Sequence, residues 1–403
     1  MVQKNLQYFR FCAYGFLKNL RLFDPFILVY LRSVNLSFAE IGLLYSFREI
    51  STVFLEIPTG IVADLAGRKK SLLLSFTGYI ISFLIFYYYS FFIPLMFAMF
   101  FFALGDAFRT GTHKAMILDY LQQNDISHLK THYYGRTRSW SQRGSAISAL
   151  LGGALVLIGN DFSVIFIVSV IPYVFNFVNI LSYPENLDGP VKKSKKNKFS
   201  LKEFSKIFEN RDYRNRVINS ASFDSLFKTV KDYIQPIINH FAILIPVGFA
   251  ISDTQKSTIA ISVIYFFIFF LNAIASRYAG VISGKFKHIS KAINITFVTG
   301  CVIAIVSGIT FELNIPAITL ILFIMLYIYQ NVRRPMNISY ISETIPDKFL
   351  AGGLSVESQT RTFLVAVLSP VMGLLADVFG IGWAISSLAV IILLFYPVIK
   401  VRK

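Results

Sequence analysis

Long apolar stretches recur along the whole chain and are separated by short polar gaps. Roughly 20 helical residues cross a hydrocarbon core about 30 Å thick, and the stretches have about this length. The expected fold class is therefore an all-α polytopic membrane protein. The pattern predicts twelve transmembrane helices, at residues 8–31, 38–63, 70–89, 92–120, 137–158, 163–183, 214–247, 256–280, 289–311, 315–343, 350–378 and 381–399.

Lysine and arginine collect in alternate gaps between these stretches. Short cytoplasmic loops of membrane proteins carry an excess of the two residues. The outer gaps hold Arg32 and Lys256 and little else. The inner gaps hold Arg68, Lys69, Lys70, Lys130, Arg136, Arg138, Lys285, Lys287, Lys291, Lys348, Lys400, Arg402 and Lys403. The pattern predicts a multi-pass protein of the cell (inner) membrane with both termini in the cytoplasm.

The composition indicates that most of the chain lies in a lipid bilayer. Hydrophobic residues make up 55% of the chain and charged residues 15%, whereas soluble domains carry about 25% charged residues. The net charge of +17 falls in the gaps, so it indicates cytoplasmic loops in a lipid bilayer and no nucleic-acid partner. Cys12 and Cys301 lie far apart in sequence, which argues against a disulfide framework. We expect a monomer without metal or cofactor.

A polar segment rich in Lys, Asn and Ser divides the chain into near-equal parts. It predicts an N-terminal six-helix bundle at 1–183, a basic cytoplasmic linker at 184–213 and a C-terminal six-helix bundle at 214–403.

The two parts also share a spacing of charged residues. Lys18-x-x-Arg21 in the first predicted helix recurs as Lys228-x-x-Lys231 in the seventh. Many carriers build a central site from internal repeats of this kind. The spacing predicts a duplication of six helices plus six.

One motif stands between the second and third predicted helices. Gly60-Ile-Val-Ala-Asp64-Leu-Ala-Gly67-Arg68-Lys69 matches G-x-x-x-D-x-x-G-R-[KR] at every fixed position. From average composition, such a string arises by chance in on the order of one chain in a thousand. It resembles the signature loop of the major facilitator superfamily. The resemblance implies two pseudo-symmetric bundles, with helices 1, 4, 7 and 10 lining a cavity, and a conformational gate in which Asp64 meets the end of helix 11.

The second half holds only a degraded copy of this motif. Gly280-Val-Ile-Ser-Gly284-Lys285 keeps glycines and a lysine but lacks the aspartate, so weaker latching is expected there. The chain contains no H-E-x-x-H, G-x-S-x-G or G-x-x-x-x-G-K-[ST], the motifs of several enzyme and ATPase classes. The sequence therefore predicts no enzyme, and transport driven by a gradient.

Cations inside the predicted helices are the candidate solute-binding residues. Ionisable side chains within membrane helices cost several kcal/mol and normally face a cavity or a partner. Arginine and lysine from both halves are suited to bind a phosphate or carboxylate. The candidates are Lys18, Arg21, Arg109, His113, Lys228, Lys231, Arg333 and Arg361.

An internal salt-bridge network is an equally weighted alternative. Asp24 lies three residues from Arg21, Lys228 lies four from Asp232, and Glu357 lies four from Arg361. Residues at these spacings face each other on a helix, so such pairs would hold helices together or form gates.

Four carboxylates are candidates for proton coupling, because a carboxylate in a low-dielectric cavity beside a releasable cation can titrate near neutral pH. They are Asp24, Glu49, Asp106 and Asp232. For Glu49 and Asp106, pairing with Arg48 and Arg109 is the competing interpretation.

The sequence thus predicts a secondary active transporter that moves a small organic anion by alternating access, with protons or a counter-anion as the coupled partner. A proton-driven exporter of amphipathic, drug-like compounds is the alternative. Against it, the fifth predicted helix lacks the G-x-x-x-G-P pattern of many drug antiporters.

Overall fold

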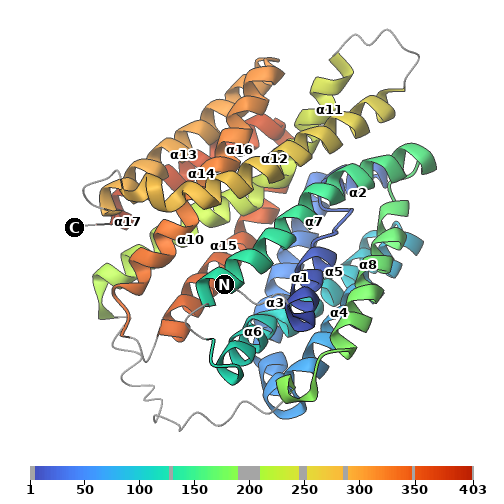
Figure 1. Cartoon of the computed structure of the whole chain (residues 1–403). Helices are drawn as coiled ribbons and strands as arrows, with labels where there is room; N and C mark the ends of the chain where they lie inside the picture. Colours follow the sequence, from blue (N-terminus) through green and yellow to red (C-terminus); the bar gives the residue numbers. More distant parts are fainter. Residues whose placement is uncertain are drawn as a thin grey trace. The chain divides into compact units, whose positions relative to one another are not determined.

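The computed structural model describes residues 5–126, 130–188, 209–244, 252–284, 289–346 and 350–401, and these form helices without strands (Figure 1). The α-helices are α1 Leu6–Lys18, α2 Ile27–Ser33, α3 Phe38–Ala66, α4 Arg68–Tyr88, α5 Phe92–Arg109, α6 Thr112–Gln123, α7 Lys130–Gly159, α8 Val164–Leu181, α10 Arg211–Val230, α11 Ile234–Leu244, α12 Asp253–Gly284, α13 Ile289–Glu312, α14 Pro316–Ser342, α15 Leu350–Phe379, α16 Ile381–Leu394 and α17 Tyr396–Ile399. Two short 3₁₀ helices are η2 Glu185–Leu187 and η3 Lys231–Tyr233. The all-α prediction is confirmed over this part of the chain.

Eight helices in the described ranges are long and apolar enough to cross a membrane. They are Arg68–Tyr88, Phe92–Gln123, Arg136–Gly159, Val164–Leu181, Asp253–Ala275, Ile289–Glu312, Pro316–Ser342 and Gly352–Phe379. The segments α1–α2, α3, α10–α11 and α16–α17 occupy the remaining predicted positions. Most boundaries agree with the apolar pattern to within a few residues, but α7 begins at Lys130 and not at residue 137.

The first predicted helix, 8–31, is broken. α1 ends at Lys18, turns follow, and α2 begins at Ile27. Pro25 lies in the turns and has no backbone N–H, so it cannot continue an α-helical hydrogen-bond ladder. Arg21 therefore sits in irregular backbone between two helical segments.

The fourth and seventh predicted helices are broken as well. α5 and α6 are separated at Thr110 and at Gly111, whose φ of +77° favours glycine. α10 passes through η3 before α11 begins, and Pro236 lies in the first turn of α11. Discontinuous helices are typical of carrier sites, because their free backbone groups can line a cavity.

The chain divides into two compact units, which we describe separately. Unit 1 comprises Met1–Tyr30, Phe47–Lys195 and Ile261–Phe269, and unit 2 comprises Leu31–Ser46, Lys196–Ala260 and Phe270–Lys403. The predicted linker, 184–213, lies mostly outside the described residues.

Unit 1 is held together by ring packing around α4. This helix packs against α5 and α8, and α1 packs against α7 and α8 (Figure 1). Tyr79, Phe83, Phe102 and Tyr173 form a cluster of ring contacts with centroids 4.9–6.4 Å apart. Aromatic pairs at this separation stabilise beyond their buried area, so these rings give the polar groups described next a rigid support.

In unit 2, α13 packs against α14 and α16, and α10 packs against α15. The first turns of α3 belong to this unit and lie against α15. Asp377 accepts hydrogen bonds from the backbone N–H of Phe38 at 2.9 Å and of Ala39 at 2.7 Å. A carboxylate at a helix N-terminus satisfies free donors and interacts favourably with the helix dipole, so α15 caps α3.

Candidate functional site

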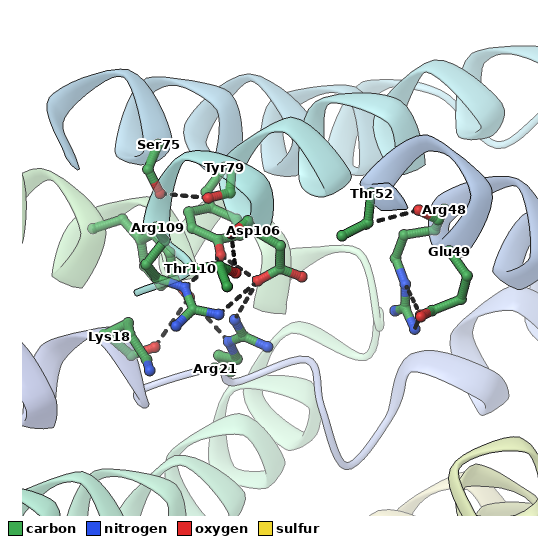
Figure 2. Close-up of polar contacts among 12 residues, drawn as sticks. Lys18, Arg21, Arg48, Glu49, Thr52, Ser75, Tyr79, Asp106, Arg109 and Thr110 are labelled. Atoms are coloured by element: carbon green, nitrogen blue, oxygen red, sulfur yellow. Dashed lines mark hydrogen bonds and ion pairs between the residues drawn. The ribbon is translucent and has the colours of Figure 1, made fainter. Parts of the chain in front are cut away.

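Asp106, near the end of α5, is the centre of a polar network in unit 1 (Figure 2). Its Oδ1 accepts from Arg109 Nη2 at 2.9 Å, lies 3.7 Å from Arg21 Nη2 and also accepts from the Tyr79 hydroxyl. Arg109 Nε in turn donates to the Tyr79 oxygen at 3.0 Å. Two guanidinium groups therefore share the Asp106 carboxylate, and Asp24 also lies within electrostatic range of Arg21.

The break between α1 and α2 places Arg21 in this network. Arg21 Nε donates to the Tyr173 hydroxyl at 3.2 Å, and that hydroxyl donates to the Lys18 carbonyl at 3.0 Å. The guanidinium also lies 5.3 Å from the Phe102 ring centroid, within cation–π range. Tyr173 thus holds both the end of α1 and Arg21 in place.

A cavity of about 370 Å³ opens beside this network, within unit 1. Its volume falls in the lower part of the range for small-molecule sites, about 300–1,000 Å³. The lining residues are Phe11, Tyr14, Gly15, Lys18, Asn19, Arg109, Gly111, His113, Lys114, Ile117, Thr137, Arg138, Ser141 and Gln142. This lining contains four cationic side chains and no carboxylate.

His113 forms the aromatic wall of the cavity. Its ring stacks on Tyr14 with centroids 3.4 Å apart and planes 8° from parallel, and Phe11 meets it edge-on. His113 Nε2 lies 3.0 Å from the Tyr183 hydroxyl. These contacts fix the ring, so that the cavity has a rigid side as well as flexible cationic side chains.

The signature loop makes its own contacts in unit 1. Arg68 forms an ion pair with Asp119 of α6. The backbone N–H of Lys69 donates to Asp188 Oδ1 at 2.7 Å, and Lys69 Nζ donates to the Tyr183 carbonyl at 3.0 Å. Gly67 has a φ of +97°, and a Cβ there would lie 2.5 Å from Asp188 Oδ1, so this position requires glycine.

The other predicted gate residues are less constrained. A Cβ added to Gly60 would meet no atom within 4 Å. The side chains of Asp64 and of the degraded copy at 280–285 lie outside the described part of the structure, so the latch expected for Asp64 stays a prediction.

The proton-coupling candidates have cationic neighbours. Glu49 is buried and accepts from Arg48 Nη2 at 2.9 Å (Figure 2). In unit 2, Asp232 Oδ1 lies 2.6 Å from Lys231 Nζ. Glu49 and Asp106 thus form the ion pairs of the competing interpretation, whereas Asp232 pairs with Lys231 and not with Lys228 as its spacing predicts. Asp24 is half-buried and has polar interactions of its own.

Predicted binding residues in unit 2 are held by protein atoms. Arg333 is fully buried, donates to the Ile293 carbonyl and to Asn219 Oδ1 at 2.5 Å each, and lies 4.9 and 5.2 Å from the Phe223 and Phe297 ring centroids. Lys231 pairs with its neighbour Asp232, and Lys228 is half-buried on α10 with polar interactions of its own. We therefore consider the cavity in unit 1 as the candidate solute site.

Arg361 corrects one expectation from the sequence. The spacing predicts a pair with Glu357, four residues earlier on the same helix. Instead, Arg361 Nη1 lies 3.7 Å from Asp224 Oδ2 on α10, and Nη2 donates to Ser358 Oγ at 2.8 Å. Because α10 packs against α15, Asp224 lies closer to the Arg361 guanidinium than Glu357 does, although Glu357 is on the same helix as Arg361.

Sequence reasoning missed several members of the site. The distribution of lysine and arginine assigns Arg138 to an inner gap, at the start of the helix predicted over 137–158, but the early start of α7 places it two turns inside the helix beside Ser141 and Gln142. The spacing Arg138-x-x-Ser141-Gln142 puts these side chains on one helix face and is the signal that could have found them. Tyr79 and Tyr173 orient the guanidinium groups, and nothing in the apolar pattern marks them out.

The described residues contain no group of three or more His, Cys, Asp or Glu side chains placed to hold a metal ion. Both cysteines are free and buried.

Comparisons with known proteins agree with this architecture. The family model of the Major Facilitator Superfamily matches residues 11–348. The fold is similar to the crystal structure of a mutant of the nucleoside transporter NupG, with a TM-score of 0.79, 13% identity and 97% and 99% of the two chains covered. No curated protein matches the chain.

Two other solved structures share the fold. A bacterial homologue of the human lysosomal transporter Spinster, inward-facing and unoccupied, has a TM-score of 0.78 at 14% identity, with 99% and 98% of the chains covered. A D-xylose–proton symporter has a TM-score of 0.71 at 13% identity, with 96% and 95% covered. At these identities the similarity establishes the fold alone.

Proposed function

Because the chain belongs to the Major Facilitator Superfamily, and is therefore a multi-pass membrane transporter and not an enzyme, we propose that its solute is a small organic anion. The anion carries a phosphate or carboxylate group and crosses the cytoplasmic membrane by alternating access. The observation that supports this proposal is the cavity in unit 1, whose lining has four cations and no carboxylate.

The charge balance around the cavity favours an anion. Asp106, beside the cavity, is shared by Arg21 and Arg109. Lys18 and Arg138 line the same space and have no carboxylate within 4.0 Å among the described residues. Cations without a direct ion pair are unfavourable in a membrane protein unless water or a ligand solvates them, so Lys18 and Arg138 would stabilise an entering oxyanion.

The hydrogen-bonding groups of the cavity point to the same ligand chemistry. Asn19, Ser141 and Gln142 add neutral donors to the cationic ones. Arginine binds phosphate and carboxylate in a planar, bidentate geometry. A lipophilic cation, the solute of the drug-exporter alternative, would meet repulsion here. The stacked ring of His113 on Tyr14 offers an apolar wall for the carbon skeleton of the anion.

The proposal predicts which cations matter for solute binding. Lys18→Gln and Arg138→Gln each remove a charge from the cavity lining. A hydrogen bond to a charged group contributes about 1.5–3 kcal/mol, so affinity should fall roughly tenfold to a hundredfold. Arg143→Gln is the matched control, since Arg143 lies on α7 with its guanidinium 5.0 Å from the Trp140 ring and does not line the cavity.

The measurement has two stages. A thermal-shift screen of the purified protein with inorganic phosphate, sugar phosphates and polycarboxylates selects an anion. Counterflow of that labelled anion is then measured in proteoliposomes for the wild type and the three variants. Equal counterflow in Lys18→Gln, Arg138→Gln and the wild type would show that the anion does not bind in this cavity. Flux of lipophilic cations with no anion flux would replace the proposal by the drug-exporter alternative.

A further inference from the structure

Glu357, in α15, is a buried carboxyl group that no part of the solute site uses. Its residue is 7% exposed, and α10 packs against this side of α15. Its Oε1 accepts one hydrogen bond, from Ser220 Oγ of α10 at 3.1 Å. No Lys, Arg or His nitrogen of the described residues forms an ion pair with it within 4.0 Å.

Several charged groups surround Glu357, but none among the described residues forms an ion pair with it. Arg361 is the cation expected from the spacing, but it turns to Asp224 and Ser358. Arg361 nevertheless lies within electrostatic range of Glu357, as do Asp224 of α10, Arg334 of α14 and the Tyr213 hydroxyl group of α10. α16, which also packs against α15, contains no titratable side chain. Glu357 is thus the buried acid of this cluster that lacks a direct counter-ion.

Burial without a counter-ion selects the neutral form of a carboxyl group. An ionised carboxylate in a low-dielectric interior is far more unfavourable than the protonated acid, and such a group normally neutralises. A neutral acid needs only ordinary hydrogen bonds, and the Ser220 hydroxyl supplies one.

We propose that Glu357 binds a proton in this conformation and is the proton-coupling group of the transporter. Loss of the proton breaks the carboxyl O–H bond, passes the proton to water and leaves a carboxylate one helical turn from Arg361. Arg361 then moves from Asp224 to Glu357. This inference rests on the proposed transport function for its role in coupling, but the protonation itself does not.

Asp224 makes this exchange of partners feasible. It is 2% exposed, and its Oδ1 has no hydrogen-bond partner among the described residues, while only Oδ2 approaches Arg361, at 3.7 Å. The ion pair is therefore loose compared with the 2.9 Å contact between Arg109 and Asp106. Arg361 has two acidic partners on facing helices, and the proton on Glu357 decides between them.

This assignment differs from the carboxylates favoured by the sequence. Glu49, Asp106 and Asp232 each have a cation within 2.9 Å. A close opposite charge favours the ionised form, so those groups are poorly suited to hold a proton in this state.

Infrared difference spectroscopy of the purified full chain tests the protonation without any solute. A pH increase should remove a carboxylic-acid C=O band, and Glu357→Gln should abolish that change. Glu357→Asp keeps a titratable acid and should retain it. Glu343→Gln is the matched control, because Glu343 is an exposed carboxylate 3.6 Å from Arg216. An unchanged band in a folded Glu357→Gln protein would overturn the proposal.

Proteoliposome transport tests the coupling role. Glu357→Gln should keep counterflow of the anion and lose uptake driven by a pH gradient. Gradient-driven uptake at the wild-type rate in Glu357→Gln would refute coupling through this residue. If the wild type transports no anion at all, the proposed solute fails, while the infrared result still decides whether Glu357 carries a proton.

Discussion

Asp106 receives two guanidinium groups and a tyrosine hydroxyl on a single oxygen, so it supports the polar network of unit 1. Asp106→Asn leaves Arg21 and Arg109 without a shared counter-charge. Leaving a partly buried charged partner unsatisfied costs about 1–3 kcal/mol. We expect a lower thermal unfolding midpoint in detergent, and a smaller loss, about 1 kcal/mol, for Tyr79→Phe. A wild-type midpoint for Asp106→Asn would show that these contacts do not stabilise the fold.

A substitution at Arg333 tests whether a buried cation stabilises the fold or binds the solute. Its guanidinium is fully buried, contacts Asn219 and the Ile293 carbonyl, and lies against two phenyl rings. Arg333→Gln should therefore lower stability while leaving anion affinity unchanged, as measured by unfolding and by thermal shift with ligand. The exposed Arg214 of α10 provides the control, since Arg214→Gln should change stability little. Loss of affinity with normal stability would restore the binding role predicted from the sequence.

Pairing between charges is the least predictable property at this scale. A cation three or four residues from a carboxylate on one helix can pair with it, and Arg109 does so with Asp106. Glu357 and Arg361, four residues apart, have a favourable spacing as well, yet Arg361 turns to Asp224 on another helix. Spacing along one helix cannot decide between two acids when the second arrives through tertiary packing.

The close approach of α3 and α15 gives a prediction at the scale of elements. A Cβ on Gly42 would overlap the Ser369 carbonyl oxygen, whereas a Cβ on Gly60, in the same helix, meets nothing within 4 Å. Gly42→Ala should destabilise the protein by about 1–3 kcal/mol through overpacking. Gly60→Ala should be neutral or stabilising by up to about 1 kcal/mol, because alanine is the better helix former.

Thermal unfolding of the two alanine variants measures this difference. Equal stabilities would show that α3 and α15 are not packed this closely.

The same pair of helices carries a sequence signal that the apolar pattern hides. Gly373-x-x-x-Asp377-x-x-Gly380 repeats the spacing of Gly60-x-x-x-Asp64-x-x-Gly67, and it keeps the aspartate that the degraded copy at 280–285 lacks. In the structure, Asp377 caps the first turn of α3. A carboxylate at this spacing is therefore used at a helix N-terminus on α15, which is the kind of contact that the family resemblance implies for Asp64.

Helix positions are predictable because the bilayer imposes a length and a composition on every crossing segment. The positions of helix breaks are not predictable from the apolar pattern, although Pro25 and Pro236 mark two of them. A proline permits a kink as well as a break in a membrane helix, and the choice depends on contacts such as those of Tyr173 with Lys18 and Arg21. The breaks and the cavity beside them are consequences of packing within a unit.

Orientation in the membrane is a property of the whole molecule, and the distribution of lysine and arginine predicts it. The inner gaps are basic and the outer gaps are nearly neutral, which predicts both termini in the cytoplasm. Ser90 lies in a predicted outer gap, and Ser182 lies at the predicted inner end of the sixth helix. Both are exposed, so a cysteine at either position can report the side on which it lies.

We expect Ser90→Cys to react with a membrane-impermeant maleimide in intact cells, and Ser182→Cys to react only after the membrane is opened. Background labelling should be low, because Cys12 and Cys301 are both buried, and the parent protein measures it directly. Labelling of Ser182→Cys alone in intact cells would reverse the orientation. The basic gaps would then lie outside the cell, against the electrostatic preference that sets topology in short loops. The cavity in unit 1 would also open toward the opposite compartment in each state of the transport cycle.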